Sequence, residues 1–190
     1  MDSIGESFGF ECSTCGAYHV GMPSFGWDWP IQYLTVPETE RARRTELDPD
    51  YCIIDGEWFF VRGCLDVPVV GHTEPFSWGA WISLSRASFQ RYAELHNDPS
   101  REPGARFLGW LSSAIPGYPD PGEEPLKAAI HMRPWPSRPY IELEPTDYPL
   151  AVEQREGISS ARVREIAERV MHMSRGRDGC RDGDAEQPGR

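Results

Sequence analysis

Apolar and polar side chains alternate with a period of two through the middle of the chain, and this pattern predicts β-strands. The stretch YCIIDGEWFFVRGCLDVPV, residues 51–69, predicts a hairpin with Asp55-Gly56 as its two-residue turn. Further strands are predicted over residues 77–84, about 127–133 and about 139–144.

Three other segments have helical periodicity. In the last one Val163, Ile166 and Val170 share a face, and Ser159 or Ser160 can cap it. Helices are also predicted over 86–95, after Ser85, and near 38–46, after Pro37. Because the helices and strands do not alternate regularly, we expect an α+β fold with a mostly antiparallel sheet, two or three helices and an N-terminal turn like a zinc knuckle.

The C-terminal end of the chain has a different composition. Residues 174–190 contain Cys180 but no large apolar side chain, so they cannot offset the entropy lost on ordering. We expect a disordered polar tail there and one globular domain over residues 1–173.

The formal charge of the 190-residue chain is −11. Such a charge argues against nucleic acid and anionic membranes as partners and favours a basic protein partner. The N-terminal residues lack the features of a secretory signal, and the five cysteines are an odd number. We therefore expect a reduced cytoplasmic protein.

The segment ECSTCGAYH, residues 11–19, has the spacing of a metal-binding turn. Cys12 and Cys15 can reach one ion, and Gly16 lets the backbone turn around them. Two alternatives remain: structural thiols without a metal, and a thioredoxin-like redox pair. The redox pair would need a helix after the motif, which Gly16, Pro23 and Pro30 disfavour.

A structural zinc ion requires four ligands, and no second Cys-x-x-Cys is present. The predicted hairpin register places Cys52 opposite Phe59, with Cys64 too far along the strand to share an ion with Cys52. We predict His19 and Cys52 as the remaining ligands and Cys64 as a buried apolar residue. The other histidines, at positions 72, 96, 131 and 172, are expected on surfaces or helix faces.

Glu142 and Glu144 share one face of a predicted strand. Two carboxylates at this spacing suit acid–base chemistry or cation binding, although a solvated strand face explains them equally well. Arg62 and Arg138 lie within apolar segments and are natural partners for such acids. These four residues form a candidate polar site.

Trp27 and Trp29 lie in a proline-bounded loop just after the thiols. An aromatic loop of this kind is either an anchor for a partner or a lid folded onto the sheet.

The motifs CSTCGAYH, DYCIIDGEWFFVRGCLDVPV, FSWGAWISLS, FLGWLSSAIPGYPD and RPYIELEPTDYPLAVEQREGIS resemble a bacterial family catalogued as domain of unknown function 2199. The similarity runs from about residue 10 to 172. The resemblance implies a stand-alone bacterial cytoplasmic domain, but it indicates neither a reaction nor a substrate. The family's Cys-x-x-Cys-Gly-x-x-His is matched by Cys12, Cys15, Gly16 and His19, and its Asp-x-Cys by Asp50 and Cys52. Where the family often has Thr-Asp-His-Pro, this chain has tyrosine at position 148.

These observations favour a non-enzymatic, acidic binding protein with a structural zinc site. The alternative is a small metal-dependent hydrolase that uses Glu142, Glu144 and Arg138. The sequence leaves the identity of the partner and the oligomeric state open.

Overall fold

The computed structural model describes residues 7–101, 103–122 and 124–173, so the predicted tail and Cys180 lie outside it. The α+β class is confirmed, but the described residues form four α-helices and one 3-10 helix instead of two or three helices. None of these helices has the length and apolar character needed to cross a lipid bilayer.

The strands are β1 (Gly9–Glu11), β2 (Tyr18–Val20), β3 (Ser24–Gly26), β4 (Thr45–Leu47), β5 (Tyr51–Ile54), β6 (Trp58–Val67), β7 (Phe76–Leu84), β8 (Arg106–Leu111), β9 (Lys127–His131) and β10 (Tyr140–Leu143). The helices are η1 (Ile31–Thr35), α1 (Glu38–Arg44), α2 (Arg86–His96), α3 (Pro149–Glu156) and α4 (Ser160–Met173).

The predicted helices at 38–46, 86–95 and the C-terminal end correspond to α1, α2 and α4. Ser85 caps α2 as expected, since its side chain accepts a hydrogen bond from the backbone of Ser88. Helix α3 was not predicted because eight residues give a weak periodic signal. Its N-terminal Pro149 is nevertheless a recognised helix-start residue.

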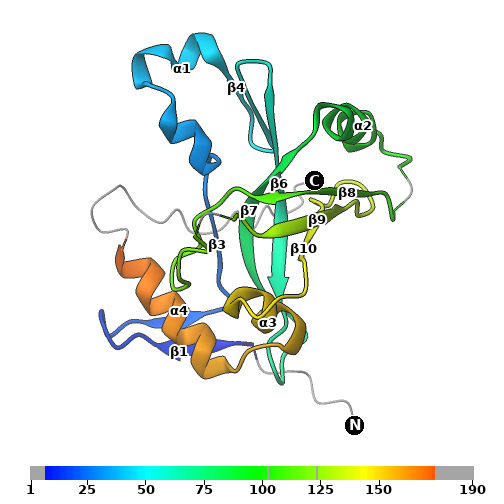
Figure 1. Ribbon diagram of the computed structural model, residues 1–190. Helices are drawn as coiled ribbons and strands as arrows, with labels where there is room; N and C mark the ends of the chain where they lie inside the picture. Colours follow the sequence, from blue (N-terminus) through cyan, green and yellow to red (C-terminus); the bar gives the residue numbers. More distant parts are fainter. Residues whose placement is uncertain (1–6, 102, 123, 174–190) are drawn as a thin grey trace, which may run out of the picture.

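Strands β6, β7, β8, β9 and β10 close into a barrel in the centre of the molecule (Figure 1). Neighbouring strands are antiparallel around most of the ring, and the ring closes where Tyr140 of β10 pairs with Cys64 of β6 in parallel. Strand β3 also joins β7 in parallel. Apart from these two parallel pairings, the described strands pair antiparallel.

The seam between β6 and β10 is completed by a side chain. Only one residue pair joins these strands, so the rest of β10 lacks a partner on that side. Gln154 of α3 occupies this position: it accepts a hydrogen bond from the backbone N–H of Leu143 (2.8 Å) and donates one to the carbonyl of Ile141 (2.7 Å). Buried backbone groups that a strand would have paired are thereby satisfied.

The residues inside the barrel form the main core. Alternate positions of every barrel strand point inward, among them Leu65, Trp78 and Ile130, which are completely buried. Helix α4 packs on the same core through Val163 and Ile166. A second, smaller cluster lies on the outer face of β6 and β7; it consists of Val36, Cys52, Ile54, Phe60 and Trp81.

The predicted hairpin register was wrong by one residue. Ile54 pairs with Trp58, and Cys52 pairs with Phe60 instead of Phe59, because the turn contains Glu57 in addition to Asp55-Gly56. A shift of one residue moves each side chain to the opposite face of the sheet. Cys52 therefore shares a face with Phe60 in the outer cluster and does not face the barrel interior.

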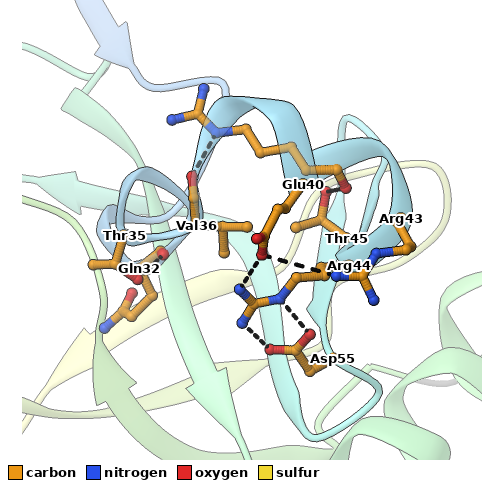
Figure 2. A network of polar contacts seen from close by, with 9 residues as sticks. Gln32, Thr35, Val36, Glu40, Arg43, Arg44, Thr45 and Asp55 are labelled. Carbon is orange, nitrogen blue, oxygen red and sulfur yellow. Dashed lines mark hydrogen bonds and ion pairs between the residues drawn. The ribbon is translucent and has the colours of Figure 1, made fainter.

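Contacts from α1 hold this longer turn in place (Figure 2). Arg44 donates hydrogen bonds to both carboxylate oxygens of Asp55 (2.8 and 2.6 Å) and to Glu40 (2.8 Å). The hydrogen bonds from Arg44 lower the pKa of Asp55. The backbone of Asp55 has a φ of 53°, a left-handed conformation that aspartate tolerates better than most residues. The ion pair and the local conformation thus fix the turn together.

The barrel seam gives a stability prediction. Gln154→Leu should lower the free energy of unfolding by about 2–4 kcal/mol, because it leaves a backbone donor and a backbone acceptor buried without partners. Chemical denaturation measures this change. The same substitution at the exposed Gln90 of α2 is the control, and we expect it to stay within about 0.5 kcal/mol of the wild type. Equal effects at the two positions would contradict a special role for Gln154.

Candidate metal centre

Cys12, Cys15 and His19 lie in the connection between β1 and β2 and at the start of the returning strand. The backbone N–H of Cys12 donates to the carbonyl of Ala17, and that of Gly16 donates to the carbonyl of Cys12, both at 2.9 Å. Gly16 has a φ of 70°, so a glycine suits the turn. The hairpin is anchored by Phe10, which is buried in the main core and stacks on His19. The turn therefore brings the side chains of Cys12, Cys15 and His19 together next to the buried ring of Phe10.

These three side chains form a group that can hold a metal ion. Their ligand atoms all lie within 4.8 Å of one another, and Cys15 Sγ is 3.7 Å from His19 Nε2. Cys12 is buried and Cys15 is exposed. The group thus has a sheltered side and an open side, and sequence spacing alone predicted all three of its members.

The surroundings of Cys12 favour its thiolate form, which is the form that binds metals. Burial alone would raise its pKa, but hydrogen bonds from the backbone of Cys15, the side chain of His172 and the backbone of Thr14 outweigh this and lower the pKa to about 6.

Helix α4 approaches the cysteine turn at two points. His172 Nε2 lies 3.1 Å from Cys12 Sγ, and Glu168 accepts a hydrogen bond from the backbone N–H of Ser13 at 2.6 Å. The donors of Ser13 lower the pKa of Glu168 to about 2. Figure 1 shows α4 running beside β1. The sequence reasoning missed His172, which it treated as an ordinary helix-face residue.

The predicted fourth ligand, Cys52, is not part of this group. It is completely buried in the outer cluster, and burial raises its pKa to about 12, so its thiol stays neutral. Cys64 also lies elsewhere, half-buried on β6, where burial and the nearby Asp66 raise its pKa. The thioredoxin-like alternative requires a Cys-x-x-Cys at the start of a helix, whereas this motif lies in a turn between two strands.

The four residues of the candidate polar site are not brought together. Glu142 contacts His131 at 2.7 Å and Glu144 contacts Lys127 at 3.8 Å, and both carboxylates are about half exposed. Arg138 instead pairs with Asp50 at 2.6 Å. Arg62 lies against the ring of Trp81, and burial lowers its pKa. Among the described residues no ion pair joins either arginine to either glutamate.

Trp27 and Trp29 are half-buried, and each stacks on another aromatic ring. Trp27 stacks on Trp78 with 5.7 Å between ring centroids, and its carbonyl accepts a hydrogen bond from Trp81 Nε1. Trp29 stacks on Tyr33 at 5.8 Å. The contacts of Trp27 with β7 agree with the lid alternative, whereas Trp29 packs on a residue of η1.

An open groove of about 460 Å³ lies on the outer face of β8, β9 and β10. Leu108 and Trp110 line it and are 66% and 42% exposed, which is unusual for large apolar side chains on adjacent outward positions. Glu142 and Glu144 border the groove, as do the basic side chains of Arg106 and Lys127. No residue of the Cys–His group lines it.

Comparison with known proteins identifies the family. Residues 11–158 match the model of the family described as "Uncharacterized protein conserved in bacteria (DUF2199)", which covers well over half of the chain, and the chain belongs to this family. The search of curated proteins and the search of solved structures each found no match.

The position of Cys52 generates a prediction about the metal site. Cys52→Ala should leave the metal content of the purified protein unchanged, because Cys52 lies in a separate cluster, while the small cavity lowers the free energy of unfolding by about 1 kcal/mol. Elemental analysis and chemical denaturation measure the two effects. Loss of the metal in this variant would restore Cys52 as a ligand.

Proposed function

We propose that this member of the family is a non-enzymatic binding protein in which a structural zinc ion fixes the N-terminal hairpin and an open sheet surface receives a basic protein partner. The supporting observation is the separation of the two features: the Cys–His group contributes no side chain to the groove on β8–β10. A metal ion held apart from the open surface would stabilise the fold without contacting the partner.

The chemistry of the group favours zinc. Thiolate and imidazole are the ligands that zinc uses in structural sites, whereas calcium and magnesium prefer oxygen. Zinc–sulfur bonds near 2.3 Å and zinc–nitrogen bonds near 2.0–2.1 Å, at tetrahedral angles, place sulfur and nitrogen about 3.6 Å apart. The separation of Cys15 Sγ and His19 Nε2, 3.7 Å, agrees with this value. Thiolate ligands also require a reducing compartment, which fits a bacterial cytoplasm.

The groove supports the binding role. Its exposed Leu108 and Trp110 offer apolar contact area at the centre, and Glu142 and Glu144 offer carboxylates along one side. The net charge of −11 would attract a basic protein over a longer range and speed its association.

The zinc proposal is tested by metal content. Protein purified under reducing conditions without chelators should carry close to one zinc ion per chain, and Cys12→Ser and Cys15→Ser should each remove it, because each deletes a thiolate ligand. Elemental analysis measures the stoichiometry. Wild-type protein with less than about a tenth of an equivalent of zinc would refute the proposal, since structural sites bind zinc tightly.

The binding proposal is tested with Lys- and Arg-rich peptides as probes and acidic peptides of equal length as controls. We expect the basic peptides to bind more tightly, and their affinity to fall as salt rises. Combined Glu142→Gln and Glu144→Gln substitutions should slow association, and Trp110→Ala should speed dissociation. Surface plasmon resonance separates the two rates.

The matched control changes two exposed carboxylates outside the groove, Glu57→Gln with Glu94→Gln, and so alters the net charge equally. If this control slows association as much as the groove variant does, the groove is not the binding surface.

A further inference from the structure

Helix α4 presents a second imidazole to the thiols of the N-terminal turn. We propose that His172 is the fourth ligand of the zinc ion, through Nε2, and completes a site of two cysteines and two histidines. This inference rests on the proposed zinc site and adds a ligand from the opposite end of the described chain. The ion would then join the first hairpin directly to the last helix.

The face of α4 that meets the turn is defined by its polar contacts. Glu168 and His172 are four residues apart, so they project from the same side of the helix. Arg164, another four residues earlier, donates a hydrogen bond to Glu168 at 3.0 Å. Glu168 in turn holds the backbone N–H of Ser13, which lies between the two cysteines. This contact fixes the helix so that His172 is positioned directly at Cys12.

The contact between Cys12 and His172 is close to the separation of two ligands of one ion. Cys12 Sγ and His172 Nε2 are 3.1 Å apart, compared with the separation of about 3.6 Å between sulfur and nitrogen ligands of tetrahedral zinc. Accommodating the ion would require these two atoms to move apart by about half an ångström. His172 Nε2 would also have to approach the rest of the group, because among the described residues the ligand atoms that all lie within 4.8 Å of one another belong to Cys12, Cys15 and His19. A rotation of the His172 side chain at the end of its helix can supply a movement of this size.

The other nitrogen of the His172 ring is sheltered from solvent. Nδ1 is buried and has no hydrogen-bond partner within the described part of the chain. The described polar partner of the ring is therefore the sulfur of Cys12, which faces Nε2. With Nε2 bound to zinc, Nδ1 would carry the ring proton and would need an acceptor such as an ordered water molecule.

The competing ligands are engaged elsewhere. His72 lies 3.1 Å from the hydroxyl of Ser160, His96 contacts the hydroxyl of Tyr92, and His131 contacts Glu142. Cys52 belongs to the outer apolar cluster. Of the described histidines, only His19 and His172 contact a cysteine of the turn.

A ligand pair at positions 12 and 172 has a thermodynamic consequence. These residues are 160 positions apart, so the ion would close a loop that spans nearly the whole described chain. A crosslink between distant residues restricts the unfolded chain strongly, and a metal bound only by the folded protein adds its binding free energy to folding. Removal of zinc should therefore weaken the attachment of the C-terminal end of α4 to the hairpin, while Val163 and Ile166 keep the helix packed on the core.

The test uses the full chain with Zn²⁺ and with Co²⁺ as a visible probe of the ligands. His172→Ala should weaken zinc binding at least about 100-fold, because loss of even an outer-shell partner typically costs about 10–100-fold. X-ray absorption of the wild-type zinc protein should show two sulfur and two nitrogen ligands. Met173→Ala is the matched control on the same helix end, since Met173 is exposed, and it should keep wild-type affinity.

His172→Cys provides a second route in case His172→Ala does not fold. A third thiolate should raise the sulfur-to-cobalt absorption by about one half relative to the wild type, because cysteine sulfur binds these ions as readily as imidazole does. Unchanged zinc affinity in His172→Ala, or an unchanged cobalt spectrum in His172→Cys, would overturn the assignment of His172 while leaving the other ligands in place. A wild-type protein that binds no zinc would instead refute the zinc site itself.

Discussion

The closure of the barrel between β6 and β10 is the constraint on which the rest of the structure depends. Two parallel neighbours meet there through a single residue pair, and the side chain of Gln154 replaces the missing strand contacts. Gly63 permits this approach, since a Cβ at that position would lie 2.9 Å from both Ile141 Cγ1 and the carbonyl oxygen of Pro139. A small residue and one buried amide therefore allow an otherwise incomplete ring to bury its apolar interior.

The same seam positions both candidate functional regions. Because Gln154 ties α3 to β10, the chain that leaves α3 enters α4 beside the N-terminal hairpin, and Glu168 and His172 reach the cysteine turn. Closure also turns one side of β8, β9 and β10 outward, which leaves Leu108 and Trp110 exposed above a groove. The Cys–His group, which could hold a metal ion, and the groove thus both follow from the closure of the barrel, and they lie apart.

This separation distinguishes the proposed role from catalysis at the same residues. The carboxylates of Glu142 and Glu144 are half exposed and contact neighbouring basic side chains, an arrangement typical of a solvated strand face. The thiols instead lie next to the main core, in which Cys12 itself is buried. Zinc at that position would act on the stability of the hairpin and of α4, and only through the fold on the surface that a partner would contact.

The sequence by itself determined the α+β class, three of the helices and the grouping of Cys12, Cys15 and His19, because all of these depend on periodicity or on short spacing. It misplaced Cys52, since one additional residue in a turn reverses the face of every side chain in the strand, and local pattern does not reveal that residue. The contact of His172 with Cys12 joins positions 160 residues apart, and only the packing of α4 on the hairpin decides it. Contacts between residues so distant in the chain arise from the closure of the barrel, which no segment of the sequence specifies alone.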